Sequence, residues 1–286
     1  MQICHSIAET RAAIAALRAC GKRIGFVPTM GFLHDGHLSL VSRAQADSDA
    51  TVVSIFVNPT QFGESADLDA YPRDETRDLT LLAAAGVDVV FLPEVAAMYP
   101  PGDETIVETT RLANMLHGQI RPGHFRGVTS VVARLFNIVQ PDVAVFGEKD
   151  YQQLQVIRRM VHDLHFPIQI IGGTTVREPD GLAMSSRNVR LSPPDRAAAT
   201  VLSRSLDAAE SLARQPGTTI GDLRDCIAQT IQSEPRATLC GLDTVAAHSL
   251  ENLFGPLSEF QSEPVAVMIS VKFGDILLID QRVLQP

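Results

Sequence analysis

The chain has 286 residues, of which 45% are hydrophobic and 20% charged, so it can bury a large core and lacks the composition of a disordered protein. Its 24 Lys and Arg against 33 Asp and Glu give a formal net charge of -9, which argues against nucleic-acid binding through phosphate contacts. The four cysteines have no CxxC spacing, and no apolar stretch approaches the roughly 20 residues that span a bilayer. We expect an acidic, cytoplasmic, globular protein that partners neither nucleic acid nor membrane.

Helical and strand patterns alternate along the first part of the chain. Apolar residues at helical spacing predict helices over 7–19, 37–46, 74–85, 128–139 and 150–164. Short apolar and β-branched runs predict strands over 23–27, 51–57, 88–92, 142–146 and 167–171. Such alternation is typical of βαβ units. We predict an α/β fold over residues 1–175, a Rossmann-like parallel sheet with helices on both faces.

The pattern changes after residue 176. A polar, turn-rich segment over 177–194 precedes helices predicted over 194–214 and 219–233. Strands are predicted over 238–246, 265–271 and 275–279. We therefore expect a second, smaller α+β domain over residues 176–286.

The segment from Pro28 to His37 follows the first of these predicted strands and opens directly into a helix. Ligands of an open parallel sheet bind beyond the carboxyl ends of its strands. His34 and His37 are three residues apart and share one face of the helix start, where free N–H groups favour an anion. We interpret the segment as a phosphate site. Two exposed loop histidines are the alternative, and zinc is disfavoured because a third ligand is not nearby.

Polar residues also occupy other segments, which follow predicted strands or precede or begin predicted helices. Four such segments carry amides, cations or hydroxyls that could bind a substrate. They are Asn58–Gly63 (NPTQFG), Gly147–Gln153 (GEKDYQQ), Arg121–Gly127 (RPGHFRG) and Arg177–Asn188 (REPDGLAMSSRN). Taken singly, each segment has a plainer interpretation as a turn, a solvated helix start or a linker. Their combination favours a nucleotide site.

The HxGH loop and the later Met-Ser-Ser-Arg loop resemble the two signatures, HIGH and KMSKS, of a nucleotidyltransferase superfamily. Five longer strings resemble those of the pantothenate synthetase (pantoate–β-alanine ligase) family and occur in the same order. They are PTMGFLHDGH, SIFVNPTQF, LHGQIRPGHFRGV, VFGEKDYQQL and DGLAMSSRN. This resemblance, which is close from about residue 20 to 200, implies that ATP and (R)-pantoate give pantoyl adenylate and pyrophosphate. The amine of β-alanine then attacks the acyl carbon of this adenylate, which gives pantothenate and AMP. The alternatives are a related nucleotidyltransferase acting on another small substrate and a non-catalytic nucleotide sensor.

The resemblance also implies roles for individual residues. His37 is expected to be the proton donor, Gln61 to bind both pantoate and β-alanine, and Gln153 to bind pantoate. The residues expected to contact ATP are Met30, Gly31, Phe32, Leu33, His34, Asp35, Gly36, His37, Gly147, Glu148, Lys149, Asp150, Val176, Met184, Ser185, Ser186 and Arg187. Val176 is expected at the end of the last sheet strand. Mg²⁺ is expected to accompany ATP, without an all-protein metal site or a tightly bound organic cofactor. A homodimer is also implied.

The chain departs from the family pattern at two places. Ile276 and Leu277 stand where the family often has a Thr-Arg pair, and Thr60 stands where methionine is common. The first departure lies in the C-terminal domain. The second is expected to alter the packing beside Gln61.

Overall fold

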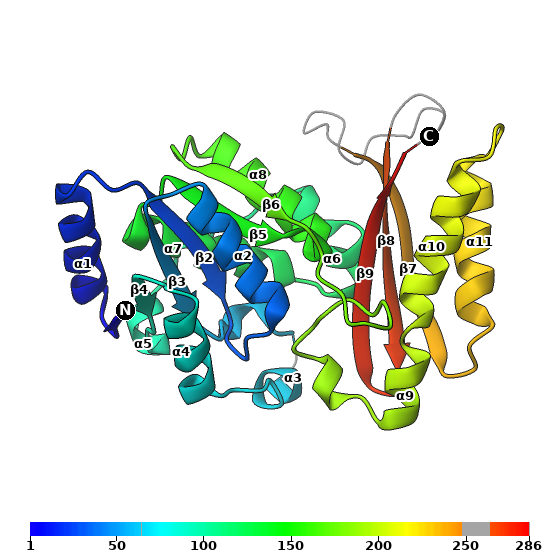
Figure 1. Ribbon diagram of the computed structural model, residues 1–286, viewed down its shortest axis with the longest axis horizontal. Coiled ribbons are helices and arrows are strands. Elements are labelled where there is room, and N and C mark those ends of the chain that lie inside the picture. The colour runs from blue at the N-terminus through cyan, green and yellow to red at the C-terminus, as the bar shows by residue number, and fades with distance from the viewer. Residues whose placement is uncertain (64, 248–263, 286) are drawn as a thin grey trace. The chain divides into compact units, whose positions relative to one another are not determined.

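A computed structural model describes residues 1–63, 65–247 and 264–285, and the chain divides into two compact units (Figure 1). The N-terminal unit comprises residues 1–148 and 152–174, and the C-terminal unit comprises residues 149–151 and 175–286. Each unit has its own buried apolar core.

The N-terminal unit is built on a six-stranded parallel sheet with the strand order β1-β4-β3-β2-β5-β6. Its strands are β1 (Gln2–Cys4), β2 (Ile24–Thr29), β3 (Ala50–Ile55), β4 (Val89–Phe91), β5 (Val143–Gly147) and β6 (Gln169–Gly173). From β2 the chain adds β3 and β4 on one side and then returns to add β5 and β6 on the other. The strand order therefore reverses between β2 and β5, where ligands of such sheets bind.

Helices cover both faces of this sheet (Figure 1), as the sequence predicts. The main helices are α1 (Ile7–Ala19), α2 (Asp35–Ala46), α4 (Glu75–Ala84), α7 (His124–Val139) and α8 (Tyr151–Asp163). Successive strand residues point to opposite faces, so Phe26 packs in the core with α1, α7 and α8, whereas Val27 packs in the core with α2 and α4. Because both faces of the sheet are buried, the sequences of its strands are continuously apolar.

Short elements connect the main ones and were not predicted. They are η1 (Pro59–Gln61), α3 (Ser65–Asp69), α5 (Val95–Met98), η2 (Leu112–Asn114), α6 (His117–Ile120), η3 (Glu148–Asp150) and η4 (Asn188–Arg190). The starts of α7 and α8 also differ from prediction. α7 begins four residues early because Gly123, with φ +79°, provides its left-handed N-cap, and α8 begins at Tyr151 because η3 precedes it.

The C-terminal unit is an antiparallel sheet of β7 (Ala237–Ala246), β8 (Val265–Phe273) and β9 (Ile276–Leu284). Helices α10 (Val201–Ala213) and α11 (Ile220–Gln232) pack on it, and α9 (Pro193–Ala198) precedes them (Figure 1). The helix predicted over 194–214 is thus two helices, which meet where the Leu202 N–H bonds to the Ala199 carbonyl with three-residue spacing. β9 continues beyond the predicted end at residue 279 through the polar pair Asp280–Gln281.

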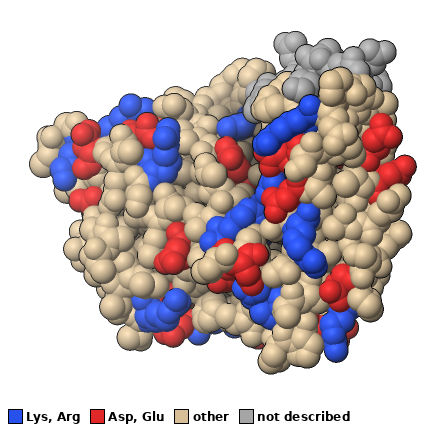
Figure 2. All heavy atoms as spheres, turned by 45° about the vertical axis from the view of Figure 1, so that its right-hand side comes forward, with Lys and Arg blue, Asp and Glu red and all other residues tan. Residues whose placement is uncertain are grey.

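Acidic and basic side chains are intermixed on the molecular face that Figure 2 draws. The C-terminal unit has ion pairs between Arg196 and Asp180 (2.7 Å) and between Arg236 and Asp195 (2.8 Å). Within the described ranges, every helix is too short or too polar to cross a membrane.

Candidate active site

The histidine loop, residues Met30–His34, follows β2 at the point where the strand order reverses. β2 pairs with β3 on one side and with β5 on the other, so the loop leaves the carboxyl edge of the sheet beside the end of β5. α2 begins at Asp35, two residues earlier than predicted, and His34 is its N-cap. The loop therefore delivers the chain into the N-terminus of a helix, where backbone N–H groups and the helix dipole favour an anion.

His34 and His37 lie against each other at the start of α2. Their ring centroids are 4.0 Å apart, with an angle of 39° between the rings. The His37 Nδ1 atom accepts the backbone N–H of His34 at 3.3 Å. Because Nδ1 is the acceptor, a neutral His37 ring carries its proton on Nε2. His37 is thus fixed as a hydrogen-bond donor through Nε2.

Two consecutive residues of the histidine loop have left-handed backbone: Gly31, with φ +81°, and Phe32, with φ +51°. A Cβ atom on Gly31 would lie 2.9 Å from Ile55 Cγ2, so both the backbone angle and the space require glycine there. Phe32 has a side chain and pays for this conformation with strain of about 1 kcal/mol or more. The loop needs a partner that stabilises it.

Asp78 of α4 is that partner. Its carboxylate, which is 1% exposed, accepts the Phe32 N–H at 2.7 Å and the Leu33 N–H at 2.8 Å. The neighbouring Arg77 donates to the Leu33 carbonyl at 2.8 Å. Burial raises the pKa of Asp78, although the amide hydrogen bonds and the Arg77 charge act in the opposite direction. The sequence analysis did not predict that Asp78 binds the loop backbone. The available signal was that this carboxylate lies on the same helix face as the buried Leu82.

Gln61 ends the short helix η1 that follows β3, and it is 8% exposed. Asn58, itself 1% exposed, donates from Nδ2 to Gln61 Oε1 at 3.0 Å and to the Gly127 carbonyl at 3.1 Å. The Gln61 Nε2 atom in turn lies 3.2 Å from Met30 Sδ of the histidine loop. The structure therefore brings Gln61 and Met30 together, and Asn58 orients the Gln61 amide. Sequence reasoning treated Asn58 as a turn residue.

Thr60, one of the two departures, belongs to this polar cluster. Its hydroxyl donates to Asn58 Oδ1 at 3.0 Å and lies 3.3 Å from the Tyr99 hydroxyl. Tyr99 also donates to Asn58 Oδ1, at 2.8 Å, and burial raises the pKa of its hydroxyl. Thr60 therefore contacts the asparagine that holds Gln61, through hydrogen bonds that methionine cannot make.

Helix α7 packs directly on η1. A Cβ atom on Gly127 would lie 2.5 Å from the Thr60 carbonyl oxygen and 2.7 Å from Gln61 Cα, so only glycine allows this approach. His124, one turn earlier on α7, lies with Nδ1 2.9 Å from the Gln61 carbonyl oxygen. Since a carbonyl can only accept, His124 donates from Nδ1. Both backbone and side chain of Gln61 are therefore fixed.

Two adjacent glutamines in α8 have different surroundings. Gln152 is 3% exposed, and its amide bonds to the Leu112 and Met115 carbonyls and to the His117 N–H at 2.7–3.0 Å. It holds the segment that precedes α7. Gln153, the predicted pantoate residue, is half-buried at the next position of the helix.

The remaining predicted ATP residues are divided between the two units. Gly147 and Glu148 belong to the N-terminal unit, whereas Lys149 and Asp150 belong to the C-terminal unit and lie 3.9 Å apart as an ion pair. Val176 does not end the last strand, because β6 stops at Gly173.

The loop Met184–Arg187 lies in the C-terminal unit, and Ser186 within it is 8% exposed. Ser185 Oγ accepts the Arg187 N–H at 3.2 Å, and the Ser185 carbonyl accepts the Asn188 N–H at 3.0 Å. Over the described residues, three or more His, Cys, Asp or Glu side chains nowhere gather as a metal site would require.

Comparison with known proteins points to one family. The sequence profile of the family described as pantoate-beta-alanine ligase matches residues 2–283. The chain is 52% identical to pantothenate synthetase of Agrobacterium fabrum over 284 residues, which cover 99% of this chain and 96% of the relative. A crystal structure of the Thermus thermophilus pantothenate synthetase superposes with a TM-score of 0.93 at 46% identity and full coverage of both chains. A Francisella tularensis pantoate-beta-alanine ligase, complexed with beta-gamma ATP and beta-alanine, gives a TM-score of 0.80 at 33% identity, covering 99% of this chain and 97% of that one.

Proposed function

This chain belongs to the pantoate-beta-alanine ligase family, and on that premise we propose which of its residues carry the synthesis of pantothenate. The enzyme is a ligase that joins pantoate to β-alanine with the use of ATP. The observation that carries the assignment of residues is the histidine loop, where two imidazoles stand at a helix N-terminus on the switch point of the sheet, with Gln61 beside Met30.

We propose that the reaction has two steps. A pantoate carboxylate oxygen attacks the α-phosphorus of ATP, the bond between the α-phosphorus and the bridging oxygen breaks, and pyrophosphate leaves. The neutral amine of β-alanine then attacks the acyl carbon of pantoyl adenylate, AMP leaves, and the amine loses a proton. A carboxylate is a poor electrophile, so the adenylate supplies the leaving group that amide formation needs.

His37 acts in the first step. Its Nε2–H, fixed by the hydrogen bond that Nδ1 accepts, donates to phosphoryl oxygens and stabilises the charge that develops as pyrophosphate departs. His34 and the free N–H groups of α2 bind the phosphates at the same helix start. The Asp78 carboxylate keeps the loop backbone in its left-handed conformation but contacts no substrate in this scheme.

Gln61 and Gln153 bind pantoate. Asn58 donates to Gln61 Oε1, and one Gln61 Nε2 hydrogen is directed at Met30 Sδ, so the second Nε2 hydrogen is the donor for an oxygen of pantoate. A neutral amide suits a hydroxy acid that must itself act as a nucleophile, since a full positive charge would stabilise the attacking carboxylate. Gln61 also borders the place where β-alanine binds.

The other expected ATP contacts remain part of the proposal. Gly147–Asp150, Val176 and Met184–Arg187 bind the nucleotide, with Lys149 and Arg187 on the phosphates. Mg²⁺ arrives with ATP, because phosphates and water supply most Mg²⁺ ligands when the protein offers few carboxylates. In this scheme residues 1–175 bind nucleotide and pantoate, and residues 176–286 form a lid domain.

Two further features belong to the same proposal. The reaction takes place in the cytoplasm, as free thiols and a reaction that consumes ATP would suit. Two copies of the chain associate as a homodimer. Sedimentation at micromolar concentration tests the dimer, because a mass of one chain, 30.9 kDa, would refute it.

The proposal is tested by incubating the purified protein with Mg–ATP, (R)-pantoate and β-alanine, and with each substrate omitted in turn. We expect pantothenate, AMP and pyrophosphate in equal amounts when all three are present. A nucleotidyl product with an alternative small substrate, without pantothenate, would favour the related nucleotidyltransferase. ATP binding without any turnover would favour a sensor.

A further inference from the structure

The loop Met184–Arg187 continues from a short hairpin in the C-terminal unit, residues 176–184, which we call the arm. Arg177 and Ala183 form an antiparallel bridge, the Met184 N–H donates to the Val176 carbonyl at 3.0 Å, and the Glu178 N–H donates to the Leu182 carbonyl at 2.8 Å. Gly181 closes the turn with φ +90°. The arm therefore runs without a break into the four residues that the proposed function places on ATP.

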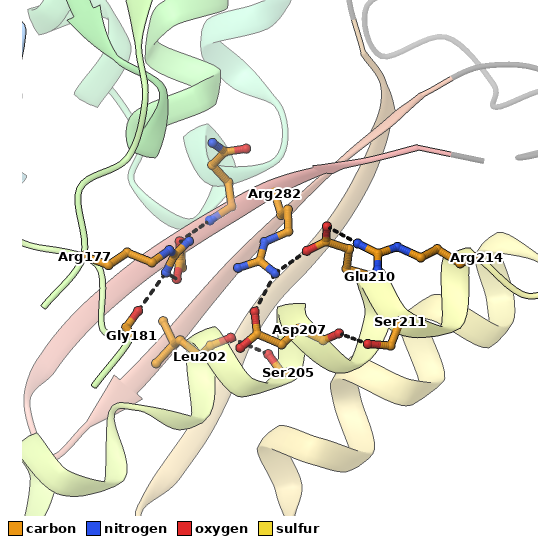
Figure 3. A network of polar contacts seen from close by, with 11 residues as sticks. Arg177, Gly181, Leu202, Ser205, Asp207, Glu210, Ser211, Arg214 and Arg282 are labelled. Carbon is orange, nitrogen blue, oxygen red and sulfur yellow. Dashed lines mark hydrogen bonds and ion pairs between the residues drawn. The ribbon is translucent and has the colours of Figure 1, made fainter. Parts of the chain in front are cut away.

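One end of the arm is fixed to β9 through a buried ion pair. Arg177 donates from Nη1 to Asp280 Oδ2 at 2.7 Å and from Nη2 to Asp280 Oδ1 at 3.0 Å. Nη1 also donates to the Gly181 carbonyl at 3.0 Å, across the turn. The Asp280 side chain is 1% exposed. Figure 3 shows Arg177 lying between Gly181 and the strand.

Packing fixes the rest of the arm. Leu182, 2% exposed, belongs to the apolar core of the C-terminal unit together with Leu202 of α10. A Cβ atom on Gly181 would lie 2.6 Å from Ser203 Oγ, so the turn sits directly on α10. Beyond the loop, Asn188 Nδ2 donates to the Ala183 carbonyl at 3.1 Å. The loop is therefore held at both ends by groups that lie outside it.

We propose that Arg177 and Asp280 are positioning residues for ATP, through which strand β9 sets the geometry of the Met184–Arg187 loop. The inference rests on the proposed function of that loop. A guanidinium is suited to the task because its planar fork satisfies two carboxylate oxygens and the Gly181 carbonyl at once, which a lysine ammonium cannot do with the same geometry. The C-terminal sheet then contributes to ATP binding although neither residue touches the nucleotide.

The chain offers a matched control on the same strand. Arg282, two residues after Asp280, also makes a double ion pair, donating from Nη1 to Asp207 and to Glu210 of α10 at 2.6 Å (Figure 3). This pair links β9 to α10 without contacting the arm. Replacing Arg282 therefore perturbs a salt bridge of β9 but leaves the arm intact.

The test compares Arg177→Lys and the double variant Arg177→Met/Asp280→Leu with Arg282→Lys. The double variant removes both charges together, so an unpaired buried charge does not unfold it. For each protein, KM for ATP, KM for pantoate and kcat are measured in pantothenate synthesis. Hydrogen exchange of the Glu178 and Met184 amides is measured in the protein without substrates.

We expect both Arg177 variants to raise KM for ATP by about 10- to 100-fold, as misplacement of a binding group does, with KM for pantoate within about twofold. Their arm amides exchange faster, whereas Arg282→Lys changes neither quantity. Equal rises in both KM values, kinetics that match Arg282→Lys, or unchanged arm exchange would overturn the inference. If the wild-type protein makes no pantothenate, the proposed function fails, and hydrogen exchange still decides whether Arg177 holds the arm.

Discussion

At the scale of single residues, each key side chain owes its role to a hydrogen bond made elsewhere. His37 donates from Nε2 because Nδ1 accepts the His34 N–H, and the orientation of the Gln61 amide is set because Asn58 donates to its oxygen and its nitrogen donates to Met30 Sδ. Asp78 makes the same kind of contribution to the backbone of Phe32. The residues that we propose to bind substrate and those that fix them are therefore separate, and substitutions distinguish them.

Replacing His37 by alanine removes the proposed donor to the departing phosphates. We expect the rate of pyrophosphate release to fall by the equivalent of about 2–4 kcal/mol of barrier, the range for losing one transition-state donor. The affinity for ATP, measured by calorimetry, changes far less, because other groups bind the ground state. Turnover close to that of the wild type would remove His37 from the mechanism.

Gln61→Ala tests substrate assignment. Its amide is expected to bind pantoate and not ATP, so KM for pantoate should rise by about tenfold or more, as for loss of a hydrogen bond to a charged group. KM for ATP should stay within about twofold. A comparable loss for both substrates would contradict the role given to Gln61 and indicate that η1 has moved.

The raised pKa of Asp78 leads us to expect that the stability of the protein depends on pH. Burial raises its pKa in the folded protein, so the folded state takes up the proton at a higher pH than the unfolded chain. The Asp78 contribution to the free energy of unfolding therefore grows as pH falls through the folded pKa, and it levels off below the ordinary aspartate value of about 3.9. Chemical denaturation of the wild type and Asp78→Asn from about pH 7 to about pH 4 should show the wild type gaining stability relative to the variant. A constant difference, or one of opposite slope, would argue against a buried Asp78.

At the scale of elements, the site depends on close contact between short segments and long helices. Helix α7 approaches η1 so closely that Gly127 leaves no room for a Cβ atom, and α4 reaches the histidine loop through Asp78. Long, well-packed helices thereby fix loops that have little structure of their own. The arm on β9 follows the same principle in the C-terminal unit.

Gly127→Ala places a methyl group 2.5 Å from the Thr60 carbonyl oxygen, against backbone that has little freedom to move. We expect a loss of about 1–3 kcal/mol in the free energy of unfolding, as for overpacked cores, together with a higher KM for pantoate. Gly63→Ala, two residues after η1, is the control, since a Cβ atom there meets nothing within 4 Å. Equal stability and equal KM for pantoate in the two variants would show that the close contact between α7 and η1 contributes to neither.

At the scale of the whole molecule, the fold class was predictable because buried parallel strands are continuously apolar and alternate with amphipathic helices. The predicted Rossmann-like sheet and smaller α+β unit are confirmed, as is the resemblance to the ligase family. β1 was missed because three residues carry too little pattern to mark an edge strand.

The side chains that hold the loops, Asp78 and Asp280, could not be predicted from the sequence for a different reason. Asp78 is 46 residues from Phe32, and Asp280 is 103 residues from Arg177, so each pairing exists only once the chain has folded. A single sequence shows a charged residue in a helix or a strand but not its partner. The His34–His37 pair was accessible because both members lie within one turn of the same helix start.

The most direct test of the account follows oxygen-18 from the carboxylate of labelled pantoate, with Mg–ATP and with or without β-alanine. An acyl-adenylate route predicts that one labelled oxygen appears in AMP and that pantothenate forms only when β-alanine is present. Formation of ADP and phosphate, with label in the phosphate, would instead mean an acyl-phosphate ligase and would contradict the role assigned to the histidine loop.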